Sequence, residues 1–283
     1  MTQRRANQLL GFPKDARLLI VNTDDFGMCH AVNEAIFTVL RQGIATSATI
    51  MAPCPWALHA AQFLTAHPEI SFGVHLTVIS EWLNYRWDPL TPREKIPTLV
   101  ESLGYFYTFD QMPEFLAKVN LSELETEFRA QIEWVLAQGL KPSHLDWHSL
   151  RIDTRPEISD VMLKLAREYG LALRVRGTIQ IEKVQGMGLP VNDFDFLDSY
   201  LIDPQDKTSR YIELLNELPE GLSEWAVHPG IANPELLTID PGGAQTRQAD
   251  FDFLMSPQAK DAITREGITL LDYRTLQDVW MSK

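Results

Sequence analysis

Hydrophobic positions along this chain fall into short unbroken runs that alternate with longer stretches of helical periodicity. The unbroken runs, many of them rich in β-branched residues, predict strands at residues 18–21, 46–51, 70–76, 144–148, 171–175, 225–228 and 268–271. The periodic stretches predict helices at residues 31–42, 55–66, 122–138, 156–169 and 208–218, and on either side of the last strand. Strands that alternate with helices over this length are typical of a mostly parallel sheet with helical crossovers.

Two folds fit this alternation, an open doubly wound sheet and a closed (β/α) barrel. The candidate polar residues follow several different strands, always at the carboxyl end, which is how barrel active sites are built. An open sheet more often gathers such residues around one switch point. No glycine-rich dinucleotide motif or phosphate-binding loop is present in the sequence. We therefore predict a single-domain α/β protein, a TIM-like (β/α) barrel variant that can be seven-stranded or distorted.

Four segments depart from the regular pattern. Residues 1–17 are expected to form an N-terminal extension, and residues 77–112 hold an aromatic, proline-containing stretch long enough to be a lid or substrate loop. Residues 180–206 resist assignment, and residues 231–249 are expected to form a loop. After the lid, the pattern Ser122-Glu123-Leu124-Glu125 resembles a capping box and predicts where the next helix begins.

Composition and charge narrow the class of protein. A formal net charge of −13 argues against a general nucleic-acid binder, because phosphate binding requires a basic face. The two cysteines, Cys29 and Cys54, form no disulfide framework or zinc motif. We expect no membrane partner and a cytoplasmic location, because no apolar run is long enough to span a bilayer and residues 1–15 lack the apolar core of a secretory signal.

Polar side chains capable of binding a metal stand at the ends of three predicted strands. Asp24 and Asp25 follow the first strand, and His75 and His148 each close a later one. One carboxylate and two imidazoles are a common ligand set for a divalent cation. With Asp25 as ligand, Asp24 is free to act as a general base. Individually, the acids could simply cap the following helix and the histidines could be satisfied core residues, so the hypothesis depends on all four occurring together.

Three further residues are candidates for the site. His228 closes another predicted strand before a Pro-Gly turn, where it could donate a proton to a leaving group or be a plain turn residue. His144 and Asp146 alternate with His148 along one face of the same strand, so we count them as candidate substrate contacts.

Four motifs in this order resemble those of the YdjC-like (ChbG/HpnK) family of carbohydrate deacetylases: TDDFG at 23–27, GVHLT at 73–77, PSHLDWH at 142–148 and VHPG at 227–230. The resemblance extends from about residue 18 to the C-terminal end. It implies a (β/α) barrel variant that hydrolyses the N-acetyl group of a sugar. It also implies that Asp25, His75 and His148 bind a metal, that Asp24 is the base and that His228 is the acid.

The sequence departs from this family after His148. Many members carry further histidines there, whereas this chain continues with Ser149-Leu150-Arg151, and Trp147 occupies a position where a small residue is usual. The departure weakens any transfer of substrate identity, but it leaves the implied ligand set intact.

The aromatic segment suits a sugar substrate. Trp82, Tyr85 and Trp87 offer flat apolar faces with polar edges, and Arg86 offers a fork of donors. The same side chains could instead pack a lid onto the barrel. Arg247, with Asp250 nearby, lies in the predicted late loop and is a further candidate for contact with the substrate.

Three hypotheses follow. The first is a metal-dependent hydrolase that deacetylates an amino sugar or oligosaccharide; the second is a hydrolase of a cyclic amide or phosphoester at the same metal; the third is a carbohydrate-binding protein without catalysis. The expected cofactor is one divalent ion, zinc or magnesium, with manganese, cobalt and nickel also compatible with the ligands. A homodimer is the expected assembly, as for many soluble enzymes.

Overall fold

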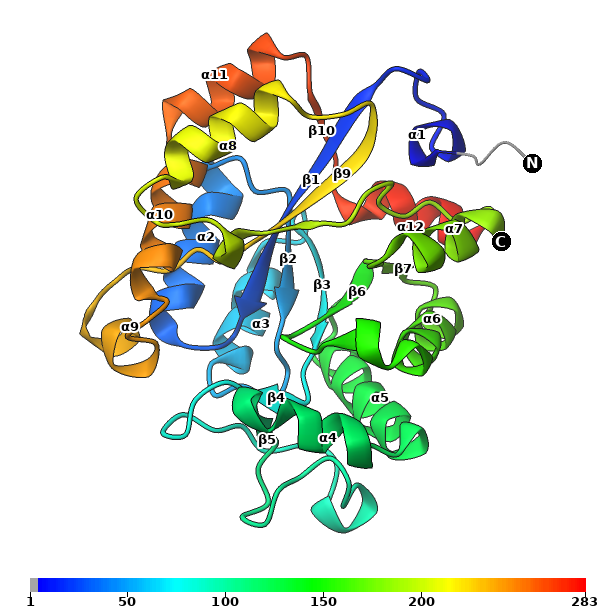
Figure 1. Ribbon diagram of the computed structural model, residues 1–283, viewed down its shortest axis with the longest axis vertical. Helices are drawn as coiled ribbons and strands as arrows, with labels where there is room; N and C mark the ends of the chain where they lie inside the picture. Colours follow the sequence, from blue (N-terminus) through cyan, green and yellow to red (C-terminus); the bar gives the residue numbers. More distant parts are fainter. Residues whose placement is uncertain (1–4) are drawn as a thin grey trace.

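A computed structural model describes residues 5–283 and contains one eight-stranded sheet in which every strand pair is parallel (Figure 1). The strand order is β7-β6-β3-β2-β1-β9-β8, and β10 pairs with the first part of β1. The strands are β1 (Arg17–Phe26), β2 (Ser47–Ile50), β3 (Ser71–Leu76), β6 (His144–Trp147), β7 (Ala172–Leu173), β8 (Leu197–Asp198), β9 (Gly221–Val227) and β10 (Thr269–Leu270). The end strands β7 and β8 do not pair with each other, so the sheet is a half-barrel. The predicted barrel variant in a single domain is confirmed.

Helices connect the strands and cover the outside of the sheet. In Figure 1, α2, α8, α10 and α11 lie on one side of the view, and α5, α6, α7 and α12 lie on the other. The longer helices are α2 (His30–Gln42), α3 (Ala57–Ala66), α5 (Leu121–Ala137), α6 (Pro156–Tyr169), α8 (Lys207–Asn216), α10 (Ala244–Met255), α11 (Pro257–Arg265) and α12 (Tyr273–Met281). The shorter ones are α1 (Ala6–Leu9), α4 (Met112–Lys118), α7 (Thr178–Gly186) and α9 (Pro234–Ile239). All helices expected between strands are present, with ends displaced by two residues at most.

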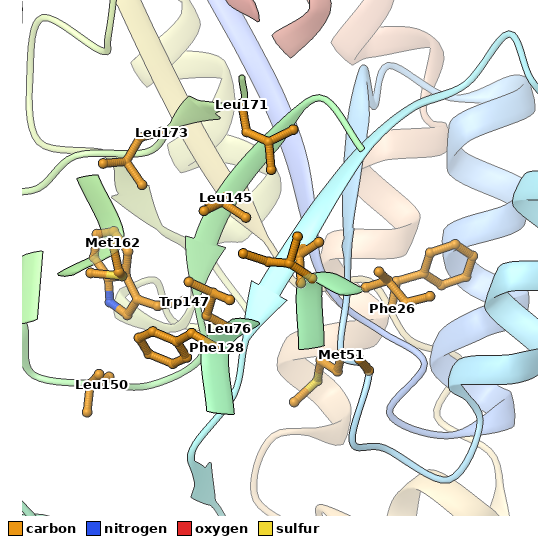
Figure 2. Packing of buried hydrophobic residues seen from close by; sticks show 14 of the residues in the cluster. Phe26, Met51, Leu76, Phe128, Leu145, Trp147, Leu150, Met162, Leu171 and Leu173 are labelled. Atoms are coloured by element: carbon orange, nitrogen blue, oxygen red, sulfur yellow. The ribbon is translucent and has the colours of Figure 1, made fainter. Parts of the chain in front are cut away.

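The faces of β1 divide the apolar core. Leu18 and Ile20 belong to a large cluster that spans most of the molecule, whereas Leu19 and Val21 pack with α8, α10 and α11 in a second cluster. Figure 2 shows part of the large cluster, with Leu145 and Trp147 of β6 near Leu173 and Met162. Even-numbered positions of β1 therefore share one face, and this face changes from apolar to polar toward the carboxyl end of the strand.

The predicted lid, residues 77–112, contains short regular elements. β4 (Ile79–Ser80) pairs with β5 (Tyr107–Thr108), and 3₁₀ turns form at Arg93–Lys95 and Phe109–Gln111. With α4, this segment lies beyond the carboxyl ends of the central strands (Figure 1). Buried Glu127 of α5 accepts hydrogen bonds from the backbone N–H groups of Leu90 (3.1 Å) and Thr91 (2.9 Å), which anchors the lid to the barrel.

The N-terminal segment packs more closely than a free extension would. Residues 1–4 lie outside the described part of the chain. The backbone N–H of Ala6 donates to the Asp193 carboxylate (3.0 Å), and α1 contacts β9. The expected extension is therefore packed against the barrel from Ala6 onward.

Two local expectations were wrong, and one unassigned segment is regular. Asn120, and not Ser122, caps α5, because its side chain accepts from Ser122 N at 2.9 Å. Residues 231–249 contain α9 and the first half of α10 instead of a loop, and Asn233 caps α9 by accepting from Leu236 N at 3.0 Å. The unassigned residues 180–206 contain most of α7 and all of β8. No helix within residues 5–283 combines the length and low polarity needed to cross a bilayer.

Candidate functional site

The two adjacent carboxylates belong to the last residues of β1, so the expectation that they follow the strand is corrected. Pairing of β1 with β2 changes register between Thr23 and Phe26, and Asp25 has a left-handed φ of 69°. Such backbone is uncommon for a residue with a side chain and costs about 1–3 kcal/mol, so it persists mainly where the surrounding structure enforces it. The irregularity turns the two neighbouring carboxylates toward different partners.

Asp25 meets two histidines from neighbouring strands. Oδ1 of Asp25 lies 3.1 Å from Nδ1 of His148 and 3.4 Å from Nε2 of His75. One ligand atom from each of the three residues lies within 4.8 Å of the other two, and all three residues are buried. β1, β2, β3 and β6 run parallel, so their carboxyl ends bring the three side chains to one rim. The structure thus brings together the three residues predicted to bind a metal.

The orientation of this cluster is set by residues behind it. Asp146 accepts a hydrogen bond from Nδ1 of His75 at 2.7 Å, because β3 and β6 place these two residues side by side. Thr49 donates to the other oxygen of Asp146 at 2.9 Å. With its Nδ1–H donated to Asp146, His75 can offer the lone pair of Nε2 to a cation that replaces the second ring proton, which is the arrangement found behind many metal-binding histidines.

The carboxylates around this cluster favour a bound cation. Burial alone would lower the pKa of His75, but the carboxylates of Asp146 and Asp24 outweigh burial and raise this pKa to about 10. The surroundings of His75 thus attract positive charge. Nε2 of His148 is buried and has no hydrogen-bond partner among the residues that the structure describes. A buried donor set of one carboxylate and two imidazoles, in surroundings this anionic, suits a divalent metal.

Arg247 is the remaining partner of Asp25. This buried guanidinium donates from Nη2 to Oδ2 of Asp25 at 2.7 Å and from Nε to Asp240 at 3.2 Å. Burial favours the protonated form of Asp25, but Arg247, His148 and His75 more than offset it and hold the pKa of this carboxyl well below its usual value. Arg247 was predicted to contact substrate from a loop; it lies on α10 and contacts Asp25 instead.

Asp24 is held by a different arginine. Arg174, which follows β7, donates to both oxygens of Asp24 at 2.7 and 2.8 Å. Asn22 donates to Oδ1 of Asp24 at 2.8 Å. Burial would raise the pKa of Asp24, but the Arg174 guanidinium outweighs burial and leaves this pKa far below its usual value. Asp24 is therefore a fixed, ionised acceptor beside the candidate metal ligands.

The inside of the barrel below Asp24 is a chain of buried polar groups. Arg174 also donates to Glu224 at 2.7 Å, and the hydroxyl of Tyr273 donates to the other oxygen of Glu224 at 2.6 Å. The ring of His144 stacks on Tyr273 with 3.6 Å between centroids. Burial, followed by the charge of Arg174, lowers the pKa of His144 well below its usual value. His144 thus lies under the site, away from the pocket where we expected a substrate contact.

His228 approaches the site from the end of β9. Its Nδ1 is 2.8 Å from the Ser199 hydroxyl, and its Nε2 points toward Asp24, 3.9 Å from Oδ2. The backbone N–H of His228 donates to Asp250 at 2.9 Å, and Asp250 is itself held by Lys207 at 2.5 Å. Ser199 thus contacts the Nδ1 edge of the imidazole and Asp250 holds the backbone of His228, while Nε2 faces the pocket.

A cavity of about 520 Å³ opens above these groups. It is lined at its base by the five residues predicted for chemistry: Asp24, Asp25, His75, His148 and His228. Trp82 is the one predicted substrate contact among its lining residues. The lining also includes residues that the sequence did not single out: Glu81, Phe109, Arg174, Arg176, Phe196 and Tyr200. Arg174 and Arg176 follow β7 at its carboxyl end, so the strand-end rule that identified His75 could have found them.

The other predicted substrate contacts support the lid or the ligands. Arg86 donates to the carbonyl of Phe106 at 2.6 Å and lies 3.6 Å from Glu101. Trp87 is buried, with its ring centroid 5.1 Å from that of His148. Tyr85 donates to the carbonyl of Met28 at 2.6 Å. These side chains, like Asp146, do not line the cavity.

The fold and the site define an α/β half-barrel protein with a candidate metal centre at the carboxyl ends of its strands. The chain belongs to the family of YdjC-like proteins, whose sequence model matches residues 18–265. The family resemblance noted in the sequence is therefore confirmed.

Individual relatives match over nearly their whole length. A carbohydrate deacetylase of Enterococcus faecalis is 32% identical, over 91% of this chain and 97% of the relative. A carbohydrate deacetylase of Geobacillus stearothermophilus is 30% identical, over 91% and 97%. The crystal structure of a proposed cellobiose-phosphate cleavage protein from Enterococcus faecalis V583 is 30% identical, with a TM-score of 0.81 over 92% of this chain and 99% of that one.

Proposed function

We propose that this protein is a metal-dependent carbohydrate deacetylase that removes the N-acetyl group of an amino sugar or oligosaccharide. The observation that carries the proposal is the convergence of Asp25, His75 and His148 at the base of the pocket, with Asp24 and His228 beside them. The relatives named carbohydrate deacetylases support the reaction type.

In this proposal Asp25, His75 and His148 hold one divalent metal. A cation bound there would lower the pKa of a coordinated water from about 15.7 to about 7 and polarise the acetamide carbonyl. Arg247 and Asp146 fix two of the three ligands, through Oδ2 of Asp25 and Nδ1 of His75. The chain thus supplies both the donors and the groups that orient them.

Asp24 accepts the proton of the attacking water. Its pKa is held far below the usual value, so Asp24 is ionised at neutral pH but is a weak base. The two hydrogen bonds from Arg174 hold the carboxylate in a fixed orientation for that step.

His228 protonates the departing amine. Amine leaving groups are poor without a proton, so a general acid must face the scissile bond. Nε2 of His228 points toward Asp24 across the pocket, and the Ser199 hydroxyl at Nδ1 fixes the ring plane. Asp24 and His228 lie close enough for a single acetamide to contact both.

The test is acetate release from N-acetylated mono- and disaccharides by the metal-loaded chain, compared between the wild type, Asp24→Asn and His228→Gln. Each change keeps the side-chain size and removes one proton-transfer function. We expect each variant to bind metal normally and to lose about 100-fold or more in kcat.

Two results would contradict the proposal. Full turnover by Asp24→Asn would show that another group is the base. Release of phosphate from sugar phosphates, or opening of a cyclic amide, without any acetate from the panel would assign the site to a different bond.

A further inference from the structure

His148 is the third proposed metal ligand, and its two ring nitrogens face different groups. Nδ1 lies 3.1 Å from Oδ1 of Asp25, which places it among the proposed ligand atoms. Nε2 is buried on the other side of the ring and has no hydrogen-bond partner within residues 5–283. Buried polar atoms are normally hydrogen-bonded, so a group close to Nε2 is a candidate partner.

A carboxylate of the lid lies close to this nitrogen. Oε1 of Glu81 is 3.7 Å from Nε2 of His148, and the Glu81 side chain is 24% exposed where it lines the pocket. Glu81 directly follows β4, whose two residues, Ile79 and Ser80, are fully buried. The backbone that carries this carboxylate is therefore held by the packed part of the lid.

Ser149 contacts the same carboxylate from the segment after β6. Its hydroxyl donates to Oε1 of Glu81 at 2.8 Å. Ser149 has a left-handed φ of 49°, a conformation that is uncommon for a residue with a side chain and persists mainly where contacts enforce it. Ser149 is also one of the residues at which this chain departs from its family, so the family motifs do not account for this contact.

The other proposed histidine ligand shows a completed version of this arrangement. Nε2 of His75 lies 3.4 Å from Oδ1 of Asp25, and its Nδ1–H donates to Asp146 at 2.7 Å. In His148 the nitrogens are exchanged, because Nδ1 faces Asp25 and Nε2 faces Glu81. Metal-binding histidines commonly donate their second N–H to a carboxylate, which fixes the ring and raises its basicity. Each histidine thus has a carboxylate on its far side.

We propose that Glu81 is the positioning residue for His148, accepting the Nε2–H of the ring so that Nδ1 is presented to the metal. The inference rests on the metal site of the proposed function and adds a residue outside the four family motifs. The separation of 3.7 Å exceeds a charge-assisted hydrogen bond by about 1 Å, a gap that rotation of the partly exposed Glu81 side chain closes. Full metal affinity then depends on the lid that carries Glu81.

The experiment is a calorimetric titration of metal-stripped protein with zinc, without substrate, for the wild type, Glu81→Ala and Glu81→Gln. Loss of such a partner typically weakens metal binding about 10- to 100-fold, and we expect this rise in Kd for Glu81→Ala. Glu81→Gln keeps an acceptor oxygen at the same reach and should recover most of the affinity. The urea midpoint of the metal-free chain should stay at the wild-type value in both variants. A lowered midpoint that accompanies the lowered affinity would indicate a structural role and overturn the assignment.

The matched control is Asp110→Asn. Asp110 is another lid carboxylate that lines the same pocket, but it is exposed. Its replacement removes one negative charge and leaves the contact between Glu81 and His148 intact. The Kd for zinc should stay within about twofold of the wild type, because salt screens exposed charges. An equal loss in this control, or equal losses in Glu81→Gln and Glu81→Ala, would assign the effect to charge alone and overturn the positioning role.

The visible spectrum of the cobalt-loaded chain tests whether Glu81 instead binds the metal directly. A partner behind His148 leaves the donor set unchanged, so Glu81→Gln should keep the band positions and intensities of the wild type. A shifted spectrum would make Glu81 a ligand and refute the inference.

The outcomes separate this inference from the proposed function. Wild-type zinc affinity in Glu81→Ala would overturn the role of Glu81 and leave the deacetylase intact. Metal binding that depends on Glu81, without acetate release from any sugar, would overturn the proposed reaction and support the positioning role. A wild-type chain that binds neither zinc nor cobalt would overturn both.

Discussion

Replacement of Arg174 by Met tests whether the carboxylates inside the barrel depend on one buried cation. The guanidinium is 1% exposed and lies 2.7–3.0 Å from oxygens of Asp24, Asp146 and Glu224. The methionine keeps much of the volume and removes the charge. Three buried carboxylates would then lose their common partner.

The expected cost follows from this geometry. Removing one partner of a buried ion pair costs about 3–5 kcal/mol, because the remaining charge stays buried without compensation. With three carboxylates affected, we expect the upper part of this range. Proteins of this kind are stable by only about 5–15 kcal/mol, so the variant should lose at least a third of its free energy of unfolding.

The assay is urea denaturation of the metal-free chain, with each midpoint converted by the measured slope. Arg129→Met is the matched control. Arg129 also donates to a carboxylate, at 2.8 Å from Glu125, but its side chain is 27% exposed. We expect a cost of about 1 kcal/mol or less for this partly exposed arginine. Equal costs for the two variants, or a cost below about 1 kcal/mol for Arg174→Met, would refute the reasoning.

The same variant gives a prediction for pH. In the wild type the folded-state pKa of Asp24 is depressed, so Asp24 contributes stability above its unfolded pKa of about 3.9 and loses it as the pH falls. Without Arg174, burial raises that pKa and this contribution disappears. The difference in unfolding free energy between wild type and Arg174→Met should therefore be largest near pH 7 and shrink in acid. A difference that stays constant down to pH 3 would contradict the assigned cause.

Three further changes test individual contacts. Ser199→Ala removes the hydroxyl at Nδ1 of His228, so kcat should fall about tenfold with metal content unchanged. Ser199→Thr should restore kcat. An unchanged kcat and pH profile in Ser199→Ala would show that the hydroxyl does not orient the imidazole. Gly73→Ala would place a Cβ atom 2.5 Å from the carbonyl oxygen of His144, so it should lower the free energy of unfolding by about 1–3 kcal/mol in a denaturation experiment. An unchanged free energy of unfolding would contradict this close approach. His144→Phe preserves the stack on Tyr273 under the site, so kcat/KM in the acetate assay should stay near the wild-type level; a large rise in KM alone would restore His144 as a substrate contact.

The sequence predicted the carboxyl ends of β3, β6 and β9 to within one residue, because parallel strands in this fold are marked by short apolar runs that stop at polar residues, but it ended β1 too early, at residue 21 instead of Phe26. That pattern predicted where Asp25, His75 and His148 meet, and the structure places them together. The alternation of His144 and Asp146 with His148 also indicated one polar face. The alternation could not show how far each side chain lies from the pocket. His144 and Asp146, which lie below the metal ligands, were therefore predicted to contact the substrate.

The features that the sequence did not predict all depend on which polar or aromatic side chains become buried in the folded chain. α10 buries Arg247 and Asp250, so the apolar periodicity of an ordinary helix is broken and the segment resembled a loop. Arginine is normally a surface residue, so the position of Arg174 at a strand end marks it as a candidate for the site but does not reveal that it is fully buried against Asp24. The lid aromatics were correctly expected near the site, but which of them pack inward depends on tertiary contacts. Trp87 is buried against His148, whereas Phe109, not singled out, lines the cavity.

The central claim is that one divalent metal, held by Asp25, His75 and His148, enables this chain to deacetylate a sugar. Its most direct test is acetate release from an N-acetylated sugar by metal-stripped protein during stepwise addition of zinc, magnesium, manganese, cobalt or nickel, for wild type and His148→Ala. We predict that the stripped wild type is inactive, that activity saturates near one equivalent of one of these ions per chain, and that His148→Ala recovers little activity at the same metal level. Acetate release by stripped protein at the restored rate, or full recovery by His148→Ala, would contradict the claim.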